Sequence, residues 1–225
     1  MTLIKSISGI RGTIGGPQGD NLTPIDIVKF TTAYVRFMSE KNEGKRLTIV
    51  VGRDARISGT MVGDIIEGTL LGCGVDVINV GLCTTPGTEM AVITHKADGG
   101  IIITASHNPK QWNALKLLNE KGEFLNDAEG KRVLALADDE AYDFPQIDSI
   151  GKVVLREDFN PTHIEQVLAL DMVDVEAVKA RQFKVVVDAV NSIGGEVIPS
   201  LLERLGCQVI KLNCEPNGEF AHNPE

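Results

Sequence analysis

The chain has 225 residues, which predicts one or two domains, and its composition of 43% hydrophobic and 24% charged residues is typical of a folded globular protein. A total of 22 Lys and Arg against 31 Asp and Glu gives a formal net charge of −9, which argues against general nucleic-acid binding. No apolar stretch has the length of a membrane span and no secretory signal is visible, so we expect no membrane partner and a cytoplasmic location.

Two residue types with metal or redox chemistry are sparse. The cysteines show no CxxC spacing, so we expect buried free thiols in a reducing compartment at Cys73, Cys83, Cys207 and Cys214. The four histidines are scattered along the chain, and no zinc site is predicted.

The N-terminal part opens on residues 6–12, where two glycines flank Arg11. Glycine lets the backbone approach a ligand closely; the alternative is a flexible turn with a solvated arginine. A helix is predicted over residues 23–38, because a capping threonine and a proline begin it and apolar residues then recur at helical spacing.

Residues 47–51 predict a buried strand that ends in a polar loop, residues 52–56. This loop contains Arg53, Asp54 and Arg56, which either include an Arg–Asp pair that shapes the loop or contact a substrate; we favour the pair. The next elements alternate: a helix capped by Ser58, a strand and a second helix are expected over residues 58–71, 75–80 and 84–95. This alternation predicts parallel βαβ units.

The chain is organised around residues 99–116. The β-branched run 101–103 predicts a buried strand, and the polar residues 104–109 break it, so Ser106 is expected on a sharp turn just past the strand end. Ligands of open α/β sheets bind at such carboxyl ends. His107 and Lys116 are close in sequence; the alternative is an ordinary polar surface turn.

The remaining chain predicts a hairpin of residues 115–118 with 122–124, and then a helix over 126–139 whose acidic end is solvated rather than a metal site. Residues 142–160 lack periodicity, so we place a boundary between domains 1–150 and 151–225. The second domain is expected to contain helices over 162–170, 173–180 and 193–205, strands over 183–188 and 207–212, and a final loop.

Residues 104–109, followed by Asn113 to Lys116, resemble the phosphoserine loop of the α-D-phosphohexomutases, which include phosphoglucomutase, phosphomannomutase and phosphoglucosamine mutase. The family usually has glycine where this chain has Ala114. Residues 9–12 and 52–56 are similar to two further family loops. The resemblance implies an α/β fold of two three-layer α/β/α domains with mixed, mainly parallel sheets, of which the second is incomplete here.

The resemblance also implies that Ser106 carries a phosphoryl group and exchanges it with a hexose phosphate through a bisphosphate intermediate. Arg11 and Lys116 would neutralise phosphate or move protons, and His107 would orient the phosphoserine or act as a base, unless it only bonds backbone. Mg²⁺ would bind one phosphate oxygen on Ser106 and three aspartates outside this chain. A hexose 1,6-bisphosphate would be the activator.

The chain covers only about the first half of a typical family member, so we expect an N-terminal part that is inactive alone. Residues 217–225 are closer to the phosphomannomutase and phosphoglucomutase branch, with phosphoglucosamine mutase as the alternative. A non-catalytic sugar-phosphate-binding or dimerisation module also stays open, as does a monomer or a homodimer. A serine hydrolase lacks its Gly-x-Ser-x-Gly motif, and a P-loop lacks its Ser or Thr after Gly-Lys.

Overall fold

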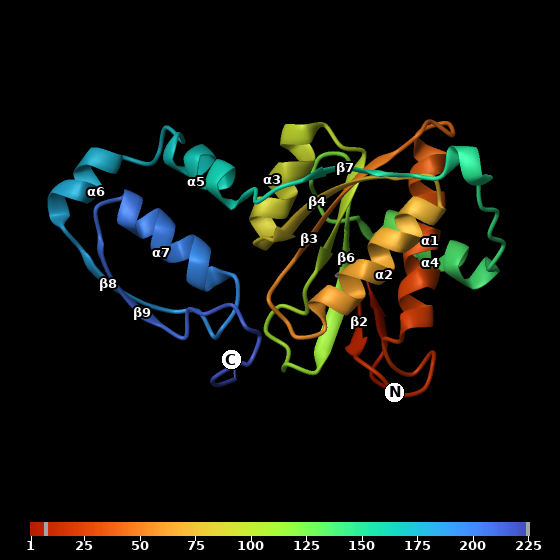
Figure 1. The fold of residues 1–225 in the computed structure, drawn as a ribbon, viewed down its shortest axis with the longest axis horizontal. Helices are drawn as coiled ribbons and strands as arrows, with labels where there is room; N and C mark the ends of the chain where they lie inside the picture. The colour runs from red at the N-terminus through yellow and green to blue at the C-terminus, as the bar shows by residue number, and fades with distance from the viewer. Residues whose placement is uncertain (7–8, 224–225) are drawn as a thin grey trace.

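The computed structural model describes residues 1–6 and 9–223, which form two α/β units lying side by side (Figure 1). The first unit is built on a sheet with the strand order β1-β2-β6-β5-β3-β4-β7. Its elements in chain order are β1 (Ile4–Ser6), β2 (Gly9–Thr13), α1 (Pro24–Lys41), β3 (Thr48–Arg53), α2 (Gly59–Gly72), β4 (Asp76–Leu82), α3 (Thr85–His95), β5 (Gly99–Ile103), β6 (Trp112–Leu118), α4 (Asp127–Asp139), the 3-10 turn η1 (Ile147–Ser149) and β7 (Val153–Arg156).

The second unit contains a two-stranded parallel sheet, whose strands are connected by a helix as parallel pairing requires. Its elements are α5 (Asn160–Leu168), α6 (Val175–Arg181), β8 (Lys184–Asp188), α7 (Gly194–Arg204) and β9 (Gln208–Leu212). Val186 and Ile210 on these strands are 57% and 45% exposed. The small sheet therefore has an open apolar face in this chain.

The sheets are mixed and mainly parallel, as expected. β3 pairs in parallel with β4 and β5, and β4 pairs in parallel with β7. The pairs β1–β2, β2–β6 and β5–β6 are antiparallel. With β8–β9, four of the seven strand pairs in the described part of the chain are parallel, and the α/β fold class is confirmed.

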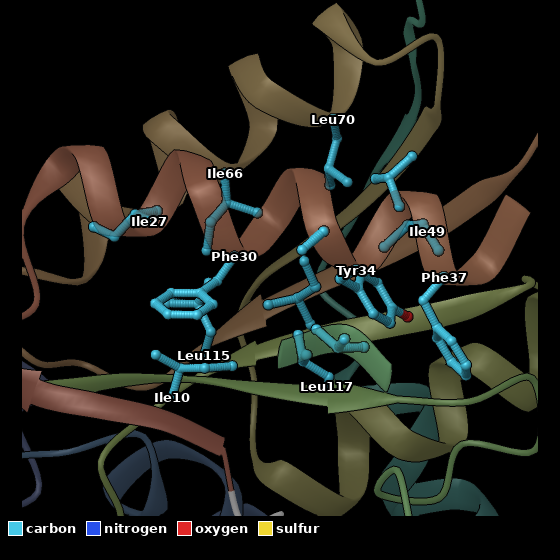
Figure 2. Packing of buried hydrophobic residues seen from close by; sticks show 14 of the residues in the cluster. Ile10, Ile27, Phe30, Tyr34, Phe37, Ile49, Ile66, Leu70, Leu115 and Leu117 are labelled. Atoms are coloured by element: carbon cyan, nitrogen blue, oxygen red, sulfur yellow. The ribbon is translucent and has the colours of Figure 1, made fainter. Parts of the chain in front are cut away.

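The main core lies between the sheet and helices α1, α2 and α4, while α3 covers the opposite face. Figure 2 shows Phe30 and Tyr34 of α1 pointing from their helix onto the sheet, where Leu115 of β6 meets them. Helix α1 begins with a capping box between Thr23 and Asp26, which satisfies backbone donors at its first turn. Tyr34 is fully buried, and its hydroxyl donates to the Leu118 carbonyl at 2.6 Å.

The N-terminal stretch differs from the expected turn. Residues 9–13 form strand β2 between β1 and β6, and Ile7 and Ser8 of the expected stretch lie outside the described residues. A Cβ on Gly12 would meet the backbone nitrogen of Leu22 at 3.0 Å, so this glycine serves close packing within the fold. A strand of this kind has no apolar alternation that would reveal it in the sequence.

Three further expectations are corrected. The predicted hairpin of residues 115–118 with 122–124 is present only as a short turn at the end of β6: Phe124 forms an antiparallel bridge with Leu118, and the Leu125 amide donates to the Leu117 carbonyl at 3.1 Å. The main partners of β6 are β5 and β2. Ser58 stands at the start of α2, but its hydroxyl makes no cap bond and accepts from the Asn113 amide at 2.9 Å instead. The four cysteines are free, but only Cys83 is buried.

Strand β7 and the end of helix α4 both contact elements from earlier in the first unit. Strand β7 is not predicted by the sequence pattern and adds to β4, although it follows the boundary expected at residue 150. The acidic end of α4 forms ion pairs with α1, through Arg36–Asp139 and Lys29–Glu140. Within residues 1–6 and 9–223, no helix combines the length and apolarity needed to cross a bilayer.

Candidate active site

Ser106 lies on the loop of residues 104–111 that connects β5 to β6, hereafter the serine loop. Strand β5 is buried along its length between β3 and β6, so the loop leaves the sheet at the carboxyl end of a central strand. Ser106 is exposed, and its backbone has a φ of 54°. This left-handed conformation is unfavourable for a residue with a Cβ, so surrounding contacts must hold it.

The beginning of the serine loop is bound to the polar loop that follows β3. The hydroxyl of Thr104 donates to Asp54 Oδ2 at 2.6 Å, and it accepts from the Ser106 amide at 3.1 Å. Asp54 also accepts from the Arg56 backbone amide at 3.0 Å. Burial raises the pKa of the Asp54 carboxyl, and the hydrogen bonds from Thr104 and Arg56 oppose that rise.

Arg56 is the most completely buried charged side chain at this edge, with no exposed side-chain surface. Its Nε donates to Asp54 Oδ2 at 3.2 Å, which confirms the expected ion pair. Its two terminal nitrogens donate, at 2.7 to 3.0 Å, to the carbonyl groups of Ser106, Asn108, Pro109 and Trp112. The guanidinium therefore occupies the centre of the serine loop and binds its backbone.

His107 follows Ser106 on the exposed turn. Its Nδ1 lies 3.5 Å from Ser106 Oγ, so a small rotation brings the ring within proton-transfer distance of the hydroxyl. This geometry is compatible with an orienting role or a base, and both stay predictions.

Arg11 and Lys116 lie on neighbouring strands of the same sheet. In the strand register Arg11 faces Ala114, while Lys116 faces Ile102 near the carboxyl end of β5. Side chains alternate along a strand, so Arg11, Ala114 and Lys116 share the face that α3 covers. Burial lowers the pKa of Lys116, and the positive charge of Arg11 lowers it further. The two predicted cations are therefore electrostatically coupled.

Glu89 on α3 belongs to the same cluster and was missed by sequence reasoning. Burial raises the pKa of its carboxyl, while Lys116 opposes that rise. The ammonium of Lys116 also lies 5.3 Å from the Phe124 ring centre. Glu89 stands inside a helix without any motif around it, so no sequence signal would have found it.

The structure thus groups the predicted residues in two sets. Ser106 and His107 share the serine loop, and Arg11 and Lys116 share the adjacent sheet face. In the described chain, the four carbonyls named above, three in the serine loop and one at the start of β6, accept from Arg56 rather than from the two expected cations. Asp54 and Arg56 are consequently the main supports of the loop.

The described residues do not by themselves fit a magnesium site. Among residues 1–6 and 9–223, no group of three His, Cys, Asp or Glu side chains is placed to hold a metal ion. The carboxylate of Asp54, which lies beside the serine loop, already accepts hydrogen bonds from Thr104 and Arg56.

Comparison with known proteins places these features in a family. Residues 3–143 match the family model described as phosphoglucomutase/phosphomannomutase, alpha/beta/alpha domain I, and residues 161–225 match domain II. The phosphoglucomutase/phosphomannomutase of Thermococcus kodakarensis is 40% identical over 218 residues, which are 95% of this chain and 47% of that protein. The phosphoglucosamine/phosphogalactosamine mutase of Sulfurisphaera tokodaii is 34% identical over 219 residues, covering 96% and 46%.

A solved structure supports the same assignment. The crystal structure of a phosphoglucomutase/phosphomannomutase family protein from Burkholderia thailandensis superposes with a TM-score of 0.77 at 25% identity, covering 99% of this chain and 47% of that one. This chain spans about half the length of the curated relatives it matches. The fold, the two domain matches and the relatives agree, and the chain belongs to the phosphoglucomutase/phosphomannomutase family.

Proposed function

We propose that this chain supplies the phosphoserine of a phosphohexomutase, an enzyme that interconverts hexose 1-phosphate and hexose 6-phosphate. The observation that carries the proposal is Ser106 itself. Its hydroxyl is exposed at the carboxyl end of β5, while hydrogen bonds hold its peptide groups on both sides. A preset hydroxyl at a sheet edge suits a reaction in which catalysis consists mainly of positioning and charge stabilisation.

In the proposed reaction, the phosphoryl group on Ser106 passes to a free hydroxyl of a hexose monophosphate. The bond between phosphorus and Ser106 Oγ breaks, a bond to the sugar oxygen forms, and the hydroxyl proton passes to a base. The bisphosphate then reorients and returns its other phosphoryl group to Ser106. Lys116 is the proposed proton carrier, because its lowered pKa makes the neutral amine more accessible.

Arg11 is proposed to stabilise charge on the substrate. A phosphoserine carries a charge of about −1.5 to −2 near neutral pH, which an arginine can bind with paired hydrogen bonds. Arg11 is half-buried on the same sheet face as Lys116, and its charge is close enough to lower the pKa of that lysine. Mg²⁺ and a hexose 1,6-bisphosphate, which the resemblance implies, stay predictions.

The sugar is proposed from the relatives alone. Similarity to the phosphoglucomutase/phosphomannomutase of Thermococcus kodakarensis favours glucose phosphate or mannose phosphate as the substrate. Phosphoglucosamine mutase is the second candidate, because relatives with that name include a probable one from Methanobrevibacter smithii at 33% identity.

A hybrid enzyme tests the proposal. Residues 1–225 are joined to the part of the Thermococcus relative that lies beyond its match, and the hybrid is assayed with the 1-phosphates of glucose, mannose and glucosamine. We expect turnover and a phosphorylated Ser106. Ser106→Ala should abolish both, while Ser200→Ala on α7 serves as the matched control and retains them.

Two outcomes contradict the proposal. If the Ser106→Ala hybrid still takes up phosphate from a hexose 1,6-bisphosphate, the nucleophile is misassigned. If the folded hybrid binds hexose phosphates without ever forming phosphoserine, the chain is a binding module rather than a phosphoryl carrier.

A further inference from the structure

We propose that Arg56, acting together with Asp54, is the positioning residue that holds the backbone of Ser106 in its left-handed conformation and thereby presents the serine hydroxyl. This inference rests on the proposed phosphoryl role of Ser106, but its structural part can be tested without any activity. The pair is called the Asp54–Arg56 clamp below.

The clamp acts on the amide side of Ser106 through one intermediate residue. The Ser106 amide donates to the Thr104 hydroxyl at 3.1 Å, and that hydroxyl donates its own hydrogen to Asp54 Oδ2 at 2.6 Å. A hydroxyl that is both acceptor and donor in this way has a fixed orientation. The amide of Ser106 is therefore anchored to the buried carboxylate of Asp54.

The clamp acts on the carbonyl side directly. Arg56 Nη2 donates to the Ser106 carbonyl at 2.8 Å and to the Asn108 carbonyl at 2.7 Å. Both peptide groups of Ser106 are thus bound, one by each member of the clamp. Since a φ of 54° is unfavourable for serine, this double attachment is the feature that keeps it there.

The chemistry of arginine suits this position and that of lysine does not. The planar guanidinium presents several donors in a rigid fork, so one side chain reaches four carbonyl groups and one carboxylate. A lysine ammonium has three donors at one point. Because the side chain of Arg56 has no exposed surface, water cannot replace the donors that a lysine would lack.

The hydrogen bonds from Arg56 also change the electrostatic surroundings of a phosphoryl group on Ser106. A carbonyl oxygen that accepts from Arg56 is directed at the buried guanidinium. The partial negative charges of the loop are therefore drawn toward a cation, which reduces their repulsion of a phosphate on Ser106. Arg56 does this through the backbone, because its nitrogens are occupied by carbonyl groups.

The test uses the 225-residue chain and the nuclear magnetic resonance signals of Ser106. The three-bond coupling between its amide and α hydrogens, read together with the strong nuclear Overhauser effect that a positive φ produces between the same two hydrogens, reports the left-handed conformation. We expect the signals that indicate a positive φ at Ser106, called the left-handed signature below, to be lost in Arg56→Ala and Arg56→Lys. Arg53→Ala is the matched control in the polar loop of residues 52–56 and should keep the signature, because the Arg53 side chain donates to the Asp54 backbone carbonyl, at 3.1 Å, rather than to the serine loop.

Chemical rescue separates this role from a general loss of stability. Millimolar methylguanidinium should fill the space left in Arg56→Ala and restore the Ser106 signature, whereas methylammonium at the same concentration should not. Where Arg56→Ala does not fold, Arg56→Lys decides the question. A folded variant in which Ser106 keeps its left-handed coupling would overturn the proposal.

A kinetic readout connects the clamp to the reaction. In the hybrid enzyme, Arg56→Lys should lower kcat by about 10²-fold and leave KM unchanged, because the residue positions the nucleophile without touching substrate. An unchanged kcat contradicts the positioning role. If the coupling is lost as expected but the wild-type hybrid forms no phosphoserine, the clamp stands and the proposed function fails.

Discussion

The guanidinium of Arg56 lies 5.1 Å from the ring centre of Phe220, so a residue of the second unit covers the cation that binds the serine loop. Two neighbours strengthen this contact. Gly218 is buried with a φ of 74°, and a Cβ there would meet the Ala55 carbonyl at 2.2 Å. Lys110 and Glu219 form an exposed ion pair at 2.9 Å. The second unit therefore touches the first beside Ser106, and movement between them would reach the serine loop.

The 225-residue chain alone is expected to fold but not to convert hexose 1-phosphate to hexose 6-phosphate. In the proposed function, Arg11, His107 and Lys116 would supply charge and proton transfer, but these three side chains alone would not hold a substrate in a reactive orientation. Without further positioning, much of the roughly 7–11 kcal/mol that proximity can supply is lost. The measurement is a coupled assay for hexose 6-phosphate, with the hybrid enzyme as positive control. Robust turnover by the chain alone would contradict the site assignment.

Lys116 should titrate at a lower pH than an ordinary lysine. We expect a pH series of amine labelling, read by mass spectrometry, to reach half-modification of Lys116 before that of exposed Lys131. Arg11→Gln should shift the Lys116 midpoint upward, because it removes a charge that lowers the pKa. Glu89→Gln should shift it downward, because Glu89 raises the pKa.

The same pKa shift has a defined sign for stability. The folded chain binds fewer protons at Lys116 than the unfolded chain does, between the lowered pKa and the ordinary value near 10.4. The contribution of this residue to the free energy of unfolding therefore rises with pH across that interval. In Lys116→Met the rise should disappear, and the melting temperature at neutral pH should be kept or increased. A marked loss of stability would instead indicate a structural role.

Gly99→Ala should destabilise the first unit. A Cβ on Gly99 would lie 2.2 Å from the Tyr34 hydroxyl and 2.8 Å from the Leu118 carbonyl, which are themselves hydrogen-bonded. We expect a loss of roughly 1–3 kcal/mol in urea unfolding. Gly68→Ala in α2 meets nothing within 4 Å and should gain about 0.5–1 kcal/mol. Equal effects of the two substitutions would contradict this packing argument.

Cys83 should resist alkylation in the folded chain. It is 1% exposed, and burial raises the pKa of its thiol to about 11, so the reactive thiolate is scarce. We expect iodoacetamide to modify the half-buried Cys207 and Cys214 first. In denaturant the three thiols should react at similar rates. Rapid labelling of Cys83 in the native chain would show that the start of α3 opens readily.

The parts of the fold that could be predicted have strong local signals. The capped helix α1 and the β-branched strand β5 lie close to the expected residues, and the position of Ser106 past the strand end follows from the proline after it. Strand β2 lacked such a signal, because it is held by pairing with β6 rather than by its own apolar pattern. Long-range pairing of this kind is not encoded in neighbouring residues.

The site shows the same division. An Arg–Asp pair could be expected in the polar loop after β3, but the loop holds two arginines, and only the structure shows that Arg56 is the partner of Asp54. The four carbonyl groups that accept from Arg56 could not be predicted from the sequence, because the direction of the backbone in a loop depends on the complete fold. Glu89 became visible only when α3 was placed beside Lys116.

The position of β2 in the sheet also has a consequence for biosynthesis. Residues 9–13 leave the ribosome early, but their partner in the sheet is residues 112–118. Until that later segment is made, strand β2 lacks its partner β6, and closing such a long loop slows folding. Arg11 and Lys116 are brought onto one face by this single late step. These two cations of the candidate site therefore come together only when β6 has been made and paired with β2.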